Sequence, residues 1–137
     1  MLMETRYDSQ ALSNKHFNLM KFEKSNPILY SSDIKRSIHY FIEVLEFEQS
    51  WVWGDPIDFG GVTKDEVEIF FCLYGQGHPG TWITIVVDNV DEYYEKIKEN
   101  GAHILAPPIN QEWNMREMYV ECPDGHILRI GHRIECD

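Results

Sequence analysis

Apolar residues recur with helical spacing in two parts of the chain. The first set follows the spacing of one amphipathic helix face and is preceded by Ser32 or Asp33 as a cap: Ile34, Ile38, Phe41, Ile42 and Leu45. The second set follows Asp88 or Asn89 and stops at Asn100-Gly101: Val90, Tyr94 and Ile97. These patterns predict helices over residues 34–45 and 90–100.

Runs rich in β-branched and aromatic residues surround both helices. In the first half they cover residues 28–30, 47–53, 59–63 and 67–74. Residues 75–80, a Gly- and Pro-rich cluster, are the predicted connector. In the second half we expect strands at 81–87 and at 103–105, the latter stopped by Pro107-Pro108, and two longer strands around Cys122-Pro123-Asp124-Gly125. The Pro-Asp-Gly sequence predicts a tight hairpin turn.

The two halves follow the same order of elements. A shift of 56 positions superimposes them, so that Leu29 falls on Ile85, Ile34 on Val90 and Phe41 on Ile97. Each half then reads as a βαβββ unit, at about residues 26–75 and 81–133. Such a pattern also arises by chance in an α+β chain, but a duplication accounts better for the common shift. We therefore predict an α+β fold with a single domain over residues 26–137.

Residues 1–25 are predicted to be a separate appendage. Asp8 or Ser9 could cap a short helix with a partial apolar stripe, and Asn26-Pro27 would end the segment. The start of the chain has no basic stretch followed by an apolar one, so we expect no secretory signal.

Composition excludes several classes of partner. The 137 residues carry a net charge of −11, which disfavours binding to nucleic acid. No apolar run approaches the ~20 residues needed to span a bilayer, so no membrane partner is expected. Three cysteines without a close pair argue against a disulfide framework, and we expect reduced thiols and a cytoplasmic location.

The paired βαβββ pattern, the Ser32-Asp33-Ile34 helix start and the Cys122-Pro123-Asp124-Gly125-His126 hairpin together resemble the vicinal oxygen chelate superfamily. This superfamily includes glyoxalase I, extradiol dioxygenases, and fosfomycin- and bleomycin-resistance proteins. Trp113-Asn114-Met115-Arg116 before the hairpin is most similar to the bleomycin-resistance branch, which often has Gly where Asn114 stands and Asp where Cys122 stands. The resemblance implies a curled mixed-sheet cup, a homodimer with shared clefts and, in that branch, antibiotic resistance.

Enzymatic members of this superfamily usually hold a divalent ion with two His and one Glu. The corresponding positions in this chain are Asn26, Trp82 and Arg129. Asn is a weak neutral donor, Trp has no usable lone pair, and Arg is a permanent cation. We therefore expect neither a metal nor another cofactor. His126, beside the turn, is interpreted as a structural residue.

Strand alternation predicts instead an aromatic cleft with a Glu and an Arg at its base. Its expected ligand-binding residues are Tyr30, Trp51, Trp53, Trp82, Trp113, Glu117, Tyr119 and Arg129. The competing interpretation is that the aromatic side chains only fill the core and that Glu117 and Arg129 form a structural ion pair.

Three functions remain open from the sequence. The first is a metal-free protein that binds a small aromatic or cationic compound. The second is a lyase, transferase or dioxygenase of this superfamily with a non-standard site, in which Glu117 would be the base. The third is a structural or regulatory dimer without a ligand. The missing metal ligands favour the first and third, and they make an enzyme the less favoured reading.

Overall fold

A computed structural model describes residues 19–135 and contains two βαβββ units, as the repeat predicts. The first unit consists of β1 (Ile28–Tyr30), α2 (Ile34–His39), the π-helical turn η3 (Tyr40–Val44), β2 (Gln49–Trp53), β3 (Phe59–Lys64) and β4 (Val67–Cys72). The second consists of β5 (Trp82–Val86), α3 (Val90–Glu99), β6 (His103–Asn110), β7 (Met115–Glu121), the short turn η4 (Pro123–Gly125) and β8 (Ile127–Arg133). The predicted N-terminal helix falls almost wholly outside the described residues.

Each unit forms a four-stranded mixed sheet, and neither sheet closes on itself. The strand orders are β1-β4-β3-β2 and β5-β8-β7-β6. In each sheet the first strand pairs in parallel with the last, and the other neighbours are antiparallel. The identical order in both sheets supports the predicted repeat.

Local sequence signals set the ends of both helices. The Asp33 side chain accepts a hydrogen bond from the Arg36 amide, and Asn89 accepts one from Glu92 in the same way. Gly101 follows α3 with a φ of +93°, a conformation that only glycine adopts easily. At the predicted hairpin turn, Asp124 and Gly125 also have positive φ values.

One strand prediction is wrong. The strand after α3 does not stop before Pro107-Pro108 but continues to Asn110. Pairing between β6 and β7 is irregular here, with register shifts between Ile104 and Ala106 and between Ala106 and Ile109. Because β6 is an edge strand, prolines without an N–H are tolerated within it.

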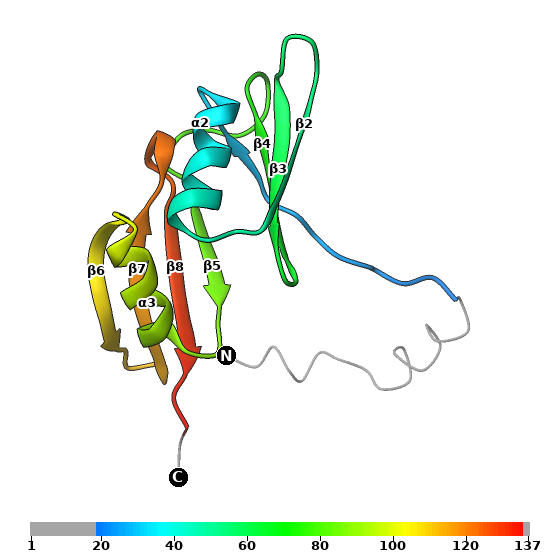
Figure 1. The fold of residues 1–137 in the computed structure, drawn as a ribbon. Coiled ribbons are helices and arrows are strands. Elements are labelled where there is room, and N and C mark those ends of the chain that lie inside the picture. Colours follow the sequence, from blue (N-terminus) through cyan, green and yellow to red (C-terminus); the bar gives the residue numbers. More distant parts are fainter. Residues whose placement is uncertain (1–18, 136–137) are drawn as a thin grey trace.

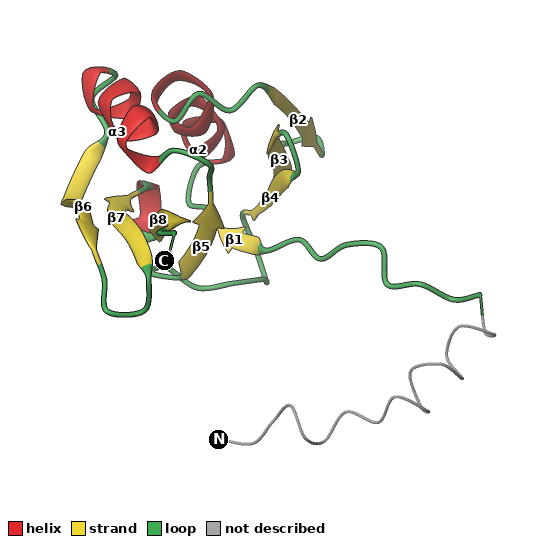
Figure 2. Ribbon diagram, turned by 90° about the horizontal axis from the view of Figure 1, so that it is seen from below, coloured by secondary structure: helices red, strands yellow, loops and turns green. Residues whose placement is uncertain are grey.

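Both units share one hydrophobic core. In Figure 2 the two sheets curve around α2 and α3, which lie side by side on the same side of the strands. Phe41, Leu45, Val90 and Ile97 from the helical segments are at most 1% exposed and pack with the inward residues of both sheets. The Tyr93 hydroxyl joins the units by donating to the Leu45 carbonyl at 2.6 Å, and burial raises its pKa. The other face of each sheet therefore points away from the helices.

His126 links the start of the second unit to the end of β1. Its Nδ1 accepts from the Thr81 amide at 3.0 Å, so Nε2 carries the proton and donates to the Tyr30 carbonyl at 2.7 Å. The side chain is 2% exposed. These bonds agree with the structural interpretation of this residue. Nearby, Asp124 accepts from the Ser32 hydroxyl and amide.

None of the helices described is long and apolar enough to cross a bilayer.

We predict that His126→Ala lowers the free energy of unfolding by about 2–5 kcal/mol, because it leaves two backbone groups without partners at a buried site. Urea denaturation measures this. His39→Ala, on the exposed side of α2, is the matched control and should change stability by about 0.5 kcal/mol or less. Equal stabilities of the two variants would show that the His126 bridge contributes nothing.

Candidate functional site

The outward face of the second sheet carries a polar pair beneath aromatic rings. Arg129 Nε donates to Glu117 Oε1 at 3.0 Å, and the Trp113 ring lies 5.0 Å from the Arg129 guanidinium carbon. The carboxylate is 4% exposed, whereas the Arg129 side chain is 35% exposed. The pair is therefore open to solvent on the arginine side only.

A glycine makes room for this buried carboxylate. Glu117 lies opposite Gly131 in the β7–β8 ladder. A Cβ at Gly131 would lie 2.6 Å from Glu117 Cγ and 2.5 Å from the Arg116 carbonyl oxygen, closer than atoms can approach. Only glycine therefore fits at position 131, opposite Glu117.

Two further aromatic rings extend this face. Trp82 on β5 and Tyr119 on β7 meet edge to face, with ring centroids 5.5 Å apart. Trp82 is 58% exposed, so most of its surface contacts no part of the described chain. Trp113 is 51% exposed in the turn before β7.

The outward face of the first sheet is apolar and aromatic. Trp51, Phe59 and Phe70 form a cluster with centroid separations of 5.5–5.8 Å. Trp51 lies across Gly61, where a Cβ would come within 2.7 Å of the indole ring. Trp53, 72% exposed, borders a shallow depression of about 430 Å³ with Ile28, Asp58, Phe59, Phe70, Cys72, Tyr74 and Gln76.

The expected site residues are thus divided between two faces. Tyr30, Trp51 and Trp53 belong to the first sheet, and the other five expected residues belong to the second sheet or to its β6–β7 turn. Within residues 19–135 both sheets pack their inner faces on the same helices, so the outward faces of the two sheets do not face each other (Figure 2).

Sequence reasoning missed Phe59, Phe70 and the two supporting glycines. Their importance depends on cross-strand pairing: Trp51 with Gly61, Gly61 with Phe70, and Glu117 with Gly131. Alternation along one strand shows which residues share a face but does not give the register between strands. None of the four residues lies two positions from a Trp, so alternation starting from the tryptophans could not have found them.

The residues at the family's metal-binding positions do not fit a divalent ion. The Asn26 amide donates to the Glu68 carbonyl at 3.0 Å, on the first unit. The Arg129 guanidinium is engaged by Glu117, and Trp82 by Tyr119. Residues 19–135 contain no group of three or more His, Cys, Asp or Glu side chains placed to hold a metal.

Burial also makes Cys122 an unsuitable nucleophile. Its side chain is 4% exposed, and burial raises the pKa of the thiol, so it stays protonated at neutral pH. The Cys72 thiol donates to the Tyr74 carbonyl at 2.8 Å.

The architecture is that of proteins built from paired βαβββ units. Residues 16–130 match the Glyoxalase/Bleomycin resistance protein/Dioxygenase superfamily, and the chain belongs to this superfamily. A search of curated protein sequences gave no match.

Solved structures share the fold at low sequence identity. TioX from Micromonospora sp. ML1 has a TM-score of 0.73 and 18% identity, covering 82% of this chain and 100% of its own. A superfamily member from Sphaerobacter thermophilus has a TM-score of 0.71 and 21% identity, with 84% and 100% covered. A glyoxalase-related enzyme from Clostridium phytofermentans has a TM-score of 0.71 and 21% identity, with 85% and 98% covered.

The Asn at position 114 of the Trp113-Asn114-Met115-Arg116 motif has a simple structural explanation. Asn114, where the resemblance to the bleomycin-resistance branch would place Gly, adopts a φ of +63°. Asn tolerates this left-handed conformation better than most non-glycine residues. The substitution therefore keeps the turn that carries Trp113.

We predict that Arg129→Met lowers the free energy of unfolding by about 2–4 kcal/mol, because the buried Glu117 carboxylate loses its partner. Glu117→Gln should cost less, since Arg129 still reaches water. The double variant Arg129→Met/Glu117→Gln should recover at least half of the loss. Chemical denaturation of the four proteins measures the coupling, and strictly additive effects would contradict a stabilising pair.

Proposed function

We propose that this protein is a metal-free homodimer that binds a small aromatic or cationic compound. The observation that carries the proposal is the outward aromatic surface of both sheets, on which Trp51, Trp53, Trp82 and Trp113 are 38–72% exposed. Large exposed apolar patches commonly mark interaction or ligand sites. Sequestration of an antibiotic-like compound would be the finer form of this function.

The geometry of one chain supports a cleft completed by a second copy. The aromatic face of the first sheet and the polar-aromatic face of the second diverge around the shared helices (Figure 2). An enclosed site arises when the first-sheet face of one copy meets the second-sheet face of its partner. A two-fold dimer would form two such sites.

Each part of this surface suits a different part of a ligand. Trp82 and Trp113 would stack on a planar ring, and Arg129 and Glu117 would orient its polar groups. Tyr30, Trp51, Trp53 and Tyr119 would form the walls. The net charge of −11 would favour the approach of a cationic compound over an anionic one.

The ligand prediction is tested with a panel of planar aromatic and cationic compounds in a thermal-shift screen, followed by calorimetry. Trp82→Ala, Trp113→Ala and Arg129→Ala should each weaken binding of a hit by about thirtyfold, or about 2 kcal/mol. Tyr94→Ala, on α3 away from both faces, is the matched control and should bind normally.

Affinity, not melting temperature alone, decides the result, because a variant that is less stable can still bind. If no compound class stabilises the parent protein, or if all three variants keep the parent affinity, the assignment of the site is wrong. A dimer that binds nothing would then be the better description.

The shared cleft predicts complementation between two defective variants. Trp51→Ala damages only the first-sheet face, and Arg129→Ala only the second. In mixed dimers one site collects both defects and the other is intact, so random re-association should restore about a quarter of the parent sites. Titration of the re-associated mixture with a hit compound measures this. No recovery would place both faces in a site within one chain.

A further inference from the structure

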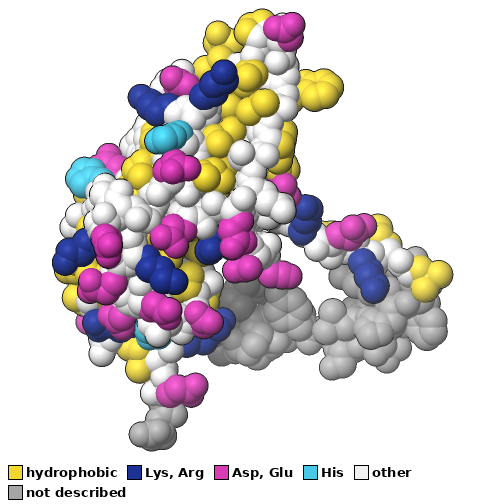
Figure 3. Space-filling model, in the orientation of Figure 1, with side chains coloured by type: hydrophobic (Ala, Val, Ile, Leu, Met, Phe, Trp, Pro, Cys, Tyr) yellow, Lys and Arg dark blue, Asp and Glu magenta, His cyan; other side chains and the backbone are white. Residues whose placement is uncertain are grey.

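Residues 19–24 form an arm whose three apolar side chains no described part of the chain covers. Leu19, Met20 and Phe22 are 90%, 71% and 96% exposed. In Figures 1 and 3 the segment leaves β1 and runs away from the body, with its apolar and charged side chains standing clear of it. Because burial of such side chains is favourable, this arm gains from a partner surface.

The base of the arm is held in place. Lys24 Nζ lies 2.8 Å from Glu68 Oε1, and this contact lowers the pKa of Glu68. The Asn26 amide donates to the Glu68 carbonyl, and the Phe70 amide donates to the Pro27 carbonyl at 3.0 Å. These contacts fix the direction in which the arm leaves the first sheet.

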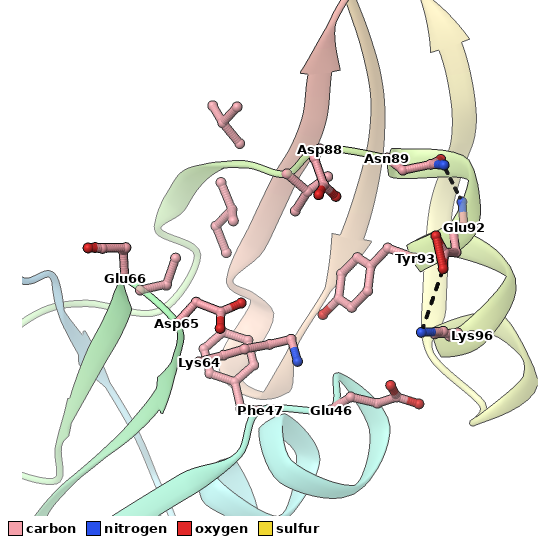
Figure 4. A pocket seen from close by; sticks show the side chains of 14 residues that line it. Glu46, Phe47, Lys64, Asp65, Glu66, Asp88, Asn89, Glu92, Tyr93 and Lys96 are labelled. Carbon is pink, nitrogen blue, oxygen red and sulfur yellow. Dashed lines mark hydrogen bonds and ion pairs between the residues drawn. The ribbon is translucent and has the colours of Figure 1, made fainter.

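A groove of about 430 Å³ lies between the two units, outside both aromatic faces. The β3–β4 turn forms one side, and the connector after β5 with the start of α3 forms the other (Figure 4). Its apolar lining is Phe47, Val67, Ile85, Val86, Val87 and Tyr93. None of these belongs to the site proposed above.

The rim of this groove is acidic. Five carboxylate residues line it, and two lysines: Glu46, Asp65, Glu66, Asp88 and Glu92, with Lys64 and Lys96. Both lysines already face acids, at 3.6 Å from Glu48 and 3.9 Å from Glu92. The carboxylates of Asp65, Glu66 and Asp88 form no ion pair or hydrogen bond within residues 19–135, so the rim favours a cationic occupant.

The arm matches the apolar floor of this groove through Met20 and Phe22. In an extended chain Met20, Phe22 and Lys24 project to one side, and Leu19, Lys21 and Glu23 project to the other. Met20 and Phe22 can then fill the floor, and Lys21 can pair with a carboxylate of the rim while Glu23 remains in solvent.

We propose that the arm of one copy, residues 19–24, lies in the acidic groove of a second copy. The Lys24–Glu68 contact directs the arm away from the body of its own chain (Figure 1), which favours a second copy over its own groove. The inference needs a second copy of the chain but no ligand on the aromatic faces.

Photo-cross-linking of the full chain tests this arrangement. Phe22 is replaced by the photoreactive residue p-benzoylphenylalanine, and light and heavy nitrogen-labelled proteins are mixed before irradiation. We expect peptides that contain residue 22 to be joined to peptides covering residues 46–47, 64–67 or 85–96, with light–heavy pairs present. Placing the photoreactive residue at Leu105, 47% exposed on β6, should give no such products.

Links only within one chain, links only to the aromatic faces, or no links at all would overturn the proposal. The dimer affinity gives a second, independent measurement. Phe22→Asp should raise the dissociation constant of the dimer at least tenfold by sedimentation equilibrium, and Lys21→Glu should raise it several-fold. The control Leu105→Asp should leave it unchanged.

Because Phe22 and Lys21 are exposed, neither substitution threatens folding. A parent protein that stays monomeric, or an affinity that Phe22→Asp does not change, overturns the arm contact. The presence or absence of ligand binding has no bearing on either readout, so the two proposals fail separately.

Discussion

The shared core between the two units is the constraint on which the rest of the structure depends. Each helix is amphipathic and buries its apolar stripe, and both helices pack in the same cluster as the inner faces of both sheets. Because each sheet packs one face on these helices, its other face points outward (Figure 2). The position of every candidate site residue follows from this arrangement.

The same constraint explains why the second sheet can bury a charge. Glu117 lies on the outward face, where a bare glycine backbone and an arginine on the neighbouring strand enclose it. A buried carboxylate is tolerated only with a partner. Arg129 supplies that partner, at the position where the sequence resemblance would place a metal ligand.

Contacts between the units are polar as well as apolar. His126 joins Thr81 to Tyr30, Asp124 holds Ser32, and Tyr93 reaches the Leu45 carbonyl. The His126 and Tyr93 bonds involve backbone groups at the ends of strands or helices, and Asp124 accepts from both the amide and the hydroxyl of Ser32, two residues after β1. They fix the relative placement of the two sheets and, through it, the groove between the β3–β4 turn and α3.

The sequence by itself determined the local elements, because these depend on near neighbours. Helix periodicity, the caps at Asp33 and Asn89 and the Pro-Asp-Gly turn were all legible from short stretches. Tertiary structure decided the rest. It carried β6 through two prolines because that strand is at an edge, and it paired Trp51 with Gly61 and Glu117 with Gly131. It also divided the residues of the predicted cleft between two outward faces. This follows because both sheets pack their inner faces on the same two amphipathic helices, so their outer faces point away from the shared core.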